Sequence, residues 1–222
     1  MKLSTETIDT LKNFSTINSS ILFKSGKTLT TISPLKTVLA TAKIAEDIPS
    51  EFAIYDLNKM LAKIGLHKDC ELEFEEDRVV FDSGRRSDYI KHCSPKVIVT
   101  PPDKKLTVSN PDYSFDLSQE DLEWQRKSAS ISGSPNFVFE SDGDKIYLVS
   151  TDVKDDSADR SQTEIGEGDG RKFSIVMKVE NFKMMEGNYT IEVSKRGLSK
   201  FTNKDKDIEY FIAIEAAQSR FE

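Results

Sequence analysis

The spacing of apolar residues predicts two amphipathic helices in the first half of the chain. Apolar positions recur at every third residue over Ser4–Asn18, and Ser4 is placed to cap this helix. A second pattern begins at Asp56 and ends at Gly65, with apolar residues at the i, i+3, i+4 and i+7 positions. Four such side chains share one helical face, so each helix is expected to bury one side.

Short apolar and β-branched segments predict strands around these helices. A hairpin is expected over Ile21–Ile32, because Ser25 and Gly26 interrupt two strand-like runs. The same criteria predict further strands at 38–44, 51–55, 71–74, 78–82 and 89–92.

The segment Ser94–Asp112 contains four of the seven prolines of the chain. Proline fixes φ and lacks a backbone donor, so this composition is typical of an extended connector. The connector separates a first domain, residues 1–110, from a second domain, residues 111–222.

After the connector the order of elements recurs, which predicts an internal repeat. A helix is expected over Leu117–Ile131, with Leu117, Trp124 and Ile131 on its apolar side, followed by a hairpin over Asn136–Ser150. The remaining predicted elements are strands near 160–165, 173–177, 189–194 and 209–215, and a short helix at 178–186. We therefore predict an α+β fold of two similar domains, each with an antiparallel sheet and two helices on one face.

The net charge of −7 is unevenly distributed along the chain. Residues 1–110 contain 16 basic and 15 acidic side chains, and residues 111–222 contain 15 and 23. The acidity therefore belongs to the second half. Because charge distribution decides affinity for a polyanion, the overall sign does not exclude a nucleic-acid partner.

The sequence offers little for catalysis or metal binding. It contains no phosphate loop, no GxSxG and no HExxH. The possible zinc ligands His67, Cys70, His92 and Cys93 do not match the usual paired spacings, so we expect no metal, no cofactor and no enzymatic activity. No apolar run approaches the roughly 20 residues that span a bilayer, so no membrane association is expected.

Several strings resemble the sliding clamps, or DNA polymerase processivity factors, of T-even-type tailed phages and their relatives. They include the opening Met1–Ser4, the run Lys24–Gly26, the segment Ala53–Asn58 and the run Gly187–Tyr189. The resemblance covers both halves of the chain. It implies a DNA clamp fold in which three subunits form a head-to-tail ring of six domains, with helices lining the hole.

In such a ring, lysine and arginine opposite the apolar helix faces would attract phosphates at every register and permit sliding. The DNA-facing residues expected on this basis are Lys12, Lys59, Lys63, Arg126, Lys127, Lys178 and Lys183. Any one of them could instead keep an outer helix face solvated.

The resemblance also implies partners that insert short apolar peptides near the connector and the last strand. The residues expected in this partner pocket are Val97, Ile98, Val99, Leu106, Phe211, Ile212, Ile214 and Ala217. The implied partners are double-stranded DNA, the replicative DNA polymerase, a separate ATP-driven clamp loader, and a late sigma-like transcription factor with its coactivator. The implied location is the cytoplasm of the infected bacterial host.

A second interpretation of the same residues is an α+β protein-interaction or nucleic-acid-binding module that does not close into a ring. Single-strand binding would favour aromatic residues interleaved with basic ones on a strand face, and no such interleaving is present. The apolar pocket residues could likewise be ordinary core.

Overall fold

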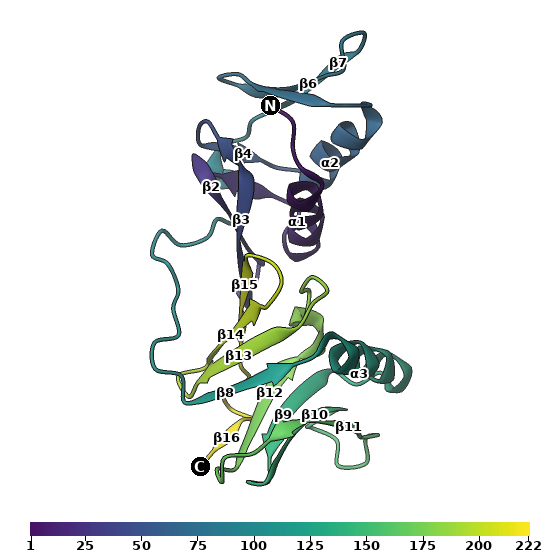
Figure 1. Ribbon diagram of the computed structural model, residues 1–222, viewed down its shortest axis with the longest axis vertical. Helices are drawn as coiled ribbons and strands as arrows, with labels where there is room; N and C mark the ends of the chain where they lie inside the picture. Colours follow the sequence, from purple (N-terminus) through teal and green to yellow (C-terminus); the bar gives the residue numbers. More distant parts are fainter. The chain divides into compact units, whose positions relative to one another are not determined.

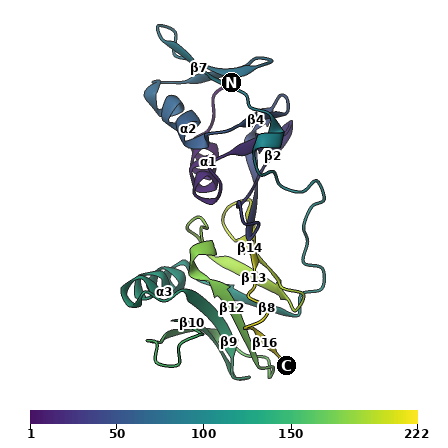
Figure 2. The ribbon, with the colours of Figure 1, turned by 180° about the vertical axis from the view of Figure 1, so that it is seen from behind.

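A computed structural model describes residues 1–222. The chain divides into two compact units, Met1–Lys105 and Leu106–Glu222, and the division lies inside the proline-rich segment. From Ile98 to Asp112 the backbone forms neither helix nor strand, as the connecting stretch in Figure 2 shows.

Unit 1 contains two α-helices, α1 (Thr5–Ile17) and α2 (Leu57–Leu66), and the short 3-10 helix η1 (Pro95–Val97). Its strands are β1 (Ile21–Phe23), β2 (Gly26–Ile32), β3 (Val38–Ile48), β4 (Phe52–Ile54), β5 (Glu71–Phe74), β6 (Arg78–Asp82) and β7 (Ser87–Lys91). Both predicted helices are confirmed, although α2 continues through Gly65 to Leu66.

The predicted hairpin over Ile21–Ile32 is wrong in its pairing. Both segments are strands, but β1 pairs with β4 and β2 pairs with β3. Gly26 stands between the two strands with φ of +104°, which an L side chain rarely adopts, and β2 pairs with β3 from this residue onward with a register shift between Gly26 and Thr28. The later strands β5, β6 and β7 form an antiparallel meander.

The helices of unit 1 pack against each other and against its strands (Figure 1). Leu11 and Phe14 of α1 and Leu57 of α2 are fully buried. Burial of such side chains contributes roughly 1.5–3 kcal/mol each, which is why the 3.6-residue periodicity located both helices.

Unit 2 contains one α-helix, α3 (Gln119–Ser132), and the short 3-10 helix η2 (Val179–Asn181). Its strands are β8 (Tyr113–Leu117), β9 (Asn136–Ser141), β10 (Lys145–Thr151), β11 (Ser161–Glu167), β12 (Phe173–Lys178), β13 (Tyr189–Ser194), β14 (Leu198–Asn203), β15 (Ile208–Ala213) and β16 (Arg220–Phe221). The hairpin predicted over Asn136–Ser150 is confirmed as β9 and β10.

Two antiparallel sheets form unit 2, in the orders β11-β10-β9-β12-β16 and β15-β14-β13-β8. Helix α3 covers β10 and β11 (Figure 1). Phe137 and Phe139 of β9 and Phe201 of β14 are fully buried, so the core lies between the two sheets.

Unit 2 differs from the sequence prediction in several elements. The helix predicted at Lys178–Glu186 is only the three-residue η2, followed by irregular backbone, so unit 2 has one α-helix instead of two. Strands β8, β14 and β16 were not predicted, and Leu117, the last residue of β8, was expected to begin the helix.

The predicted apolar side of α3 is also wrong. Trp124 and Ile131 are 51% and 87% exposed, whereas the buried residues of α3 are Leu122, Gln125 and Ala129. The amide nitrogen of Gln125 donates to the carbonyl oxygen of Leu148 (2.6 Å) and to Thr163 Oγ1 (3.2 Å), so hydrogen bonds to β10 and β11, which the apolar pattern does not reveal, turn this face of α3 inward.

The longest helix, α3, has 14 residues, and no helix meets the length and hydrophobicity that a bilayer crossing requires.

Candidate nucleic-acid interface and partner surfaces

The three basic residues predicted to face DNA in unit 1 lie on its helices but differ in accessibility. Lys12 on α1 is exposed and its Nζ lies 2.8 Å from the Asp9 carboxylate. Lys59 on α2 is exposed. Lys63 is largely covered and forms an ion pair with Asp88 of β7. The hydrogen bond from Lys63 holds the pKa of Asp88 below its ordinary value, so this pair fastens β7 to α2.

In unit 2 the adjacent residues Arg126 and Lys127 point to different environments. Lys127 is exposed on α3, whereas Arg126 turns inward and its Nη2 donates to the carbonyl oxygen of Phe182. Burial lowers the pKa of Arg126, yet a guanidinium keeps its charge at neutral pH. Lys178 lies 3.8 Å from Glu180, and Lys183 is exposed in the loop after η2.

Arg126 belongs to a buried polar network that holds the loop between η2 and β13. The Tyr189 hydroxyl donates to the carbonyl of Met185 (2.5 Å), and the backbone N–H of Met185 donates to the Tyr210 hydroxyl (3.1 Å). Burial raises the pKa of Tyr189 to about 12 and raises that of Tyr210 as well, so both phenols stay protonated. This network was missed, because the charge pattern does not distinguish an inward arginine from an outward one.

The exposed members of the predicted DNA-facing set are therefore Lys12, Lys59, Lys127 and Lys183, with Lys178 half-buried. Arg126 and Lys63 instead have specific partners within their own units. The contact of these residues with DNA stays a prediction.

The residues predicted for a partner pocket are described unit by unit. Val97 is 61% exposed, and Ile98 and Val99 are half-buried. The Asn18 amide donates to the carbonyls of Ile32 (2.8 Å) and Val99 (3.3 Å), which fixes the start of the connector.

In unit 2, Leu106 is half-buried and Ala217 is exposed, while Phe211, Ile212 and Ile214 are core residues at the end of β15. A cavity of about 530 Å³ lies beside this part of the connector, between Thr107–Asn110 and Ser194–Leu198. The partner pocket itself stays a prediction.

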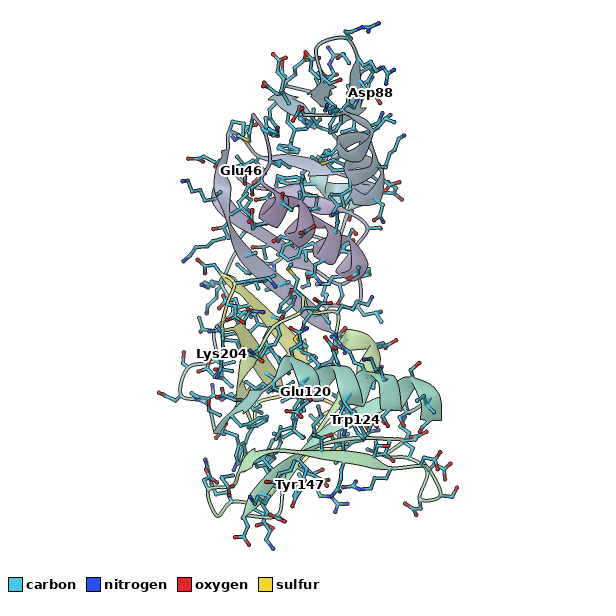
Figure 3. All side chains as sticks on the ribbon, turned by 45° about the vertical axis from the view of Figure 1, so that its right-hand side comes forward. Glu46, Asp88, Glu120, Trp124, Tyr147 and Lys204 are labelled. Atoms are coloured by element: carbon cyan, nitrogen blue, oxygen red, sulfur yellow. The ribbon has the colours of Figure 1, made fainter.

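Several strands lie at the edges of their sheets and pair on one side only. They include β7 in unit 1 and β11 in unit 2. Unpaired edges expose rows of N–H and C=O groups that can pair with another chain. Asp88 of β7 and Trp124 beside β11 are both labelled in Figure 3.

The cysteines and histidines lie in separate small environments. Cys70 is buried and Cys93 half-buried, and burial raises the pKa of both thiols. His67 Nδ1 lies 3.1 Å from Ser83 Oγ, and His92 stacks on Phe52 with ring centroids 4.8 Å apart. The structure gathers no group of three or more His, Cys, Asp or Glu side chains that could hold a metal ion.

Solved structures of similar fold include sliding clamps. The structure of the PCNA2–PCNA3 complex from Sulfolobus tokodaii matches with a TM-score of 0.65 at 13% identity, covering 95% of this chain and 96% of that chain. The DNA polymerase III subunit beta of Pseudomonas aeruginosa matches with a TM-score of 0.67 at 11% identity, covering 94% of this chain and 62% of that chain. At this level of identity the comparison establishes the fold, which is that of a DNA clamp.

Sequence comparison narrows this class. The family described as DNA polymerase processivity factor matches residues 4–73, and the family described as gp45 sliding clamp, C terminal, matches residues 114–216. The sliding clamp of Vibrio phage KVP40 is 30% identical over 97% of this chain and 100% of that protein. The sliding clamp of Enterobacteria phage T4 is 30% identical over 97% of each.

The chain belongs to the sliding-clamp family of DNA polymerase processivity factors found in T4 and related phages. The resemblance and the predicted α+β clamp fold with antiparallel sheets are thereby confirmed, while the trimeric ring stays a prediction.

Proposed function

We propose that three copies of this chain close head to tail into a ring around duplex DNA and tether the replicative polymerase to it. The observation that carries the proposal is the pair of unpaired edge strands, β7 in unit 1 and β11 in unit 2. Joining β7 of one copy to β11 of the next uses both edges and repeats until the ring closes. Six similar units then surround the hole.

The surface around β11 is acidic and carries exposed apolar groups. Glu164 and Glu167 of β11 share one cation, Lys145, at 2.9 and 2.6 Å, so the strand keeps net negative charge. Trp124 and Ile131 of α3, the helix that packs on β11, are exposed. Large exposed aromatic and aliphatic groups are typical of the centre of a protein interface.

Strand β7 and the turn before it carry the opposite net charge. Arg85 and Arg86 lie in the turn before β7, Lys91 ends the strand, and all three are exposed. The one acidic residue of β7, Asp88, is already paired with Lys63. Tyr89 is 49% exposed and offers an aromatic side chain to the contact. Opposite charges on the two edges favour the head-to-tail pairing over self-pairing of like edges.

Within the ring, the exposed cations Lys12, Lys59, Lys127 and Lys183, with Lys178, would face the duplex. Attraction of this kind is nearly the same at every register, so it centres DNA without fixing the clamp in place. Lys63 and Arg126 contribute positive potential while their side chains hold β7 and the η2–β13 loop. The acidic remainder would lie outside and repel DNA from unproductive contacts.

The clamp would act in the cytoplasm of the infected bacterium as a platform for several partners. A separate clamp loader would open the ring with ATP, and the polymerase would dock through a short apolar peptide. A late sigma-like transcription factor and its coactivator would use the same mode of binding. The match to the processivity-factor family supports the role in replication. The loader and the transcription factors are proposed as partners from the resemblance to the phage clamps.

Light scattering coupled to size exclusion tests the oligomer directly. We expect a mass of about three times the 25.1 kDa chain at micromolar concentration. Trp124→Ala should shift the species toward monomer, because it removes an aromatic group from the centre of the proposed contact. Leu35→Ala, which truncates a 77% exposed residue in the β2–β3 turn, is the matched control and should stay trimeric.

Topological holding gives the same proposal a second readout. With loader and ATP present, the clamp should persist on DNA whose ends are blocked and slide off open linear DNA. A monomeric chain at high micromolar concentration, or equal retention on both DNA substrates, would contradict the ring.

A further inference from the structure

Helix α3 buries few side chains for its length. Of its 14 residues only Leu122, Gln125 and Ala129 are buried, and one of these three is a glutamine. Helix α1 of unit 1 has 13 residues and buries five, three of them large and apolar. Because burial of apolar surface is the main source of stability at such a contact, α3 is held on its sheet less firmly than α1.

Polar contacts supply much of the seat of α3 on β10 and β11. Gln125 Nε2 donates to Leu148 O (2.6 Å) and to Thr163 Oγ1 (3.2 Å). Ser128 Oγ donates to Ser161 Oγ at 2.7 Å. These residues and one further serine of β10 are here called the polar seam, which consists of Gln125, Ser128, Ser150, Ser161 and Thr163.

Two buried atoms of the polar seam, Ser150 Oγ and Gln125 Oε1, have no hydrogen-bond partner within the chain. Ser150 is 1% exposed and Gln125 is fully buried. Ser150 lies opposite Ser161 in the register of β10 and β11, and cross-strand partners share one face of a sheet. Its hydroxyl therefore lies on the face that α3 covers. A buried polar group without a partner loses its hydration without compensation, so closing the seam is unfavourable for both atoms.

Strand β11 has few other contacts to hold it. None of its seven residues is buried, and it pairs on one side only, with β10. That pairing shifts register between Ile146 and Tyr147. A strand with these properties belongs to the part of a fold that opens at low free energy. Since Gln125 and Ser128 bond to β11, α3 and β11 lose contacts together when either one moves away (Figure 1).

We propose that α3 and β11 form a local opening unit, which separates from β10 and the core of unit 2 while the rest of the chain stays folded. Opening brings water to Ser150 Oγ and Gln125 Oε1, and this hydration lowers the free energy of the open state. A strand added to the outer edge of β11 holds the unit closed. This closing step rests on the proposed function, in which the added strand is β7 of the next copy.

Hydrogen exchange of the full chain, followed residue by residue by NMR, tests the opening. The sample is kept at a concentration where light scattering gives the 25.1 kDa mass of one chain. The informative amides are those bonded within α3 and between β11 and β10. They should exchange at least about tenfold faster than the amides of β9 and β12, with little dependence on urea, because local opening exposes little surface. Exchange of α3 and β11 only through global unfolding, with the urea dependence of β9, would overturn the proposal.

Ser150→Ala tests whether the unsatisfied hydroxyl drives the opening. The substitution removes a buried group that has no partner, so exchange of both α3 and β11 should slow about fivefold. Ser199→Ala is the matched control, because Ser199 is equally buried but its hydroxyl donates to Ile212 O at 2.8 Å. This control should not slow the exchange of α3 and β11. Equal effects of the two substitutions would contradict the role of the polar seam.

Ser128→Ala tests whether the two elements open as one unit. It removes the hydrogen bond to Ser161, so α3 and β11 should both exchange several-fold faster and by similar factors. Faster exchange in α3 alone would show that the elements open separately and would overturn the single opening unit.

Raising the protein concentration tests the closing step. Once light scattering shows that copies have joined, exchange of α3 and β11 should slow at least about tenfold, while that of β9 stays unchanged. Joined copies without this protection would overturn the closing step. A chain that stays single at every concentration would contradict the proposed ring, and the dilute sample would still decide whether α3 and β11 open locally.

Discussion

Both units contain antiparallel sheets, but the segments that pack on them differ. In unit 1 these segments are the α-helices α1 and α2, which contact each other and whose interior backbone groups are hydrogen-bonded within each helix. In unit 2, α3 has no helical neighbour, and the segment after β12 forms only η2 and a loop. A buried loop must find partners for its backbone groups among side chains.

The side chains that satisfy this loop come from three different elements. Arg126 of α3 serves Phe182 O, while Tyr189 of β13 and Tyr210 of β15 serve the two backbone groups of Met185. A helix in one repeat can thus be replaced by a loop in the other when a long cationic side chain turns inward. We therefore expect single polar substitutions to lower the stability of unit 2 more than that of unit 1.

Arg126→Ala should lower the free energy of unfolding more than the other substitutions considered below. The change leaves the Phe182 carbonyl without its charged donor and opens space beside Tyr189 and Tyr210. We expect a loss of about 3 kcal/mol in the free energy of unfolding, measured by urea denaturation. The neighbouring Lys127→Ala should change stability by less than about 0.5 kcal/mol, because Lys127 is exposed. Equal effects of the two substitutions would contradict the inward role of Arg126.

Gly187→Ala should have the next largest effect, because it alters the end of the same loop. Gly187 has φ of +146°, and an added Cβ would lie 2.4 Å from the Asn203 side-chain nitrogen. Asn203 is buried and holds the following turn through hydrogen bonds to Asp205 N and Lys206 N, each at 2.9 Å. We expect a loss of about 2 kcal/mol on denaturation.

Gly197→Ala is the control that separates backbone strain from crowding. Gly197 also has positive φ, +95°, but no atom lies within 4 Å of an added Cβ. Its substitution should therefore cost only the strain, about 1 kcal/mol. If Gly197→Ala proved as costly as Gly187→Ala, the contact with Asn203 would not matter.

The spacing of apolar residues located the helices and strands in which the apolar positions are also the buried ones. Helices α1 and α2 and most strands belong to this group. The helix expected at Lys178–Glu186 was wrong. Val179, Phe182 and Met185 have helical spacing and Gly187 stands where a cap would, but the hydrogen bonds that hold this segment come from residues distant in sequence. Strand β8 alternates buried and exposed residues, so its sequence carries a strand pattern that the prediction missed.

The candidate site was predictable to a similar degree. Charge patterning found the basic helix faces, but it could not separate Arg126 from Lys127, because a rotation of about 100° between neighbours decides which one turns inward. The exposed Trp124 was assigned to the core because large apolar residues usually lie there. Its exposure could be recognised only from the position of α3 on its sheet.

The N-termini of α1 and α3 are capped differently. In unit 2, Ser118 and Asp121 cap α3 from within its own sequence, with Ser118 Oγ accepting from Asp121 N at 3.1 Å. In unit 1, the cap of α1 also involves Glu46 of β3, labelled in Figure 3, whose carboxylate accepts from Ser4 N and from Thr7 Oγ1. A carboxylate at a helix N-terminus is stabilised by the peptide dipoles.

Glu46→Gln should therefore cost about 1 kcal/mol at neutral pH, the smallest of the three effects. Desolvation opposes ionisation of Glu46, but its hydrogen bonds from Thr7 and Ser4 prevail and hold its pKa below the ordinary value of 4.5. A lowered folded-state pKa contributes stability that is fully present above the unfolded pKa and is lost as pH falls through the folded value. The difference in unfolding free energy between the native chain and Glu46→Gln should therefore shrink between about pH 7 and about pH 3 in urea titrations. A difference that stayed constant over this range would show that the charge of Glu46 does not hold α1.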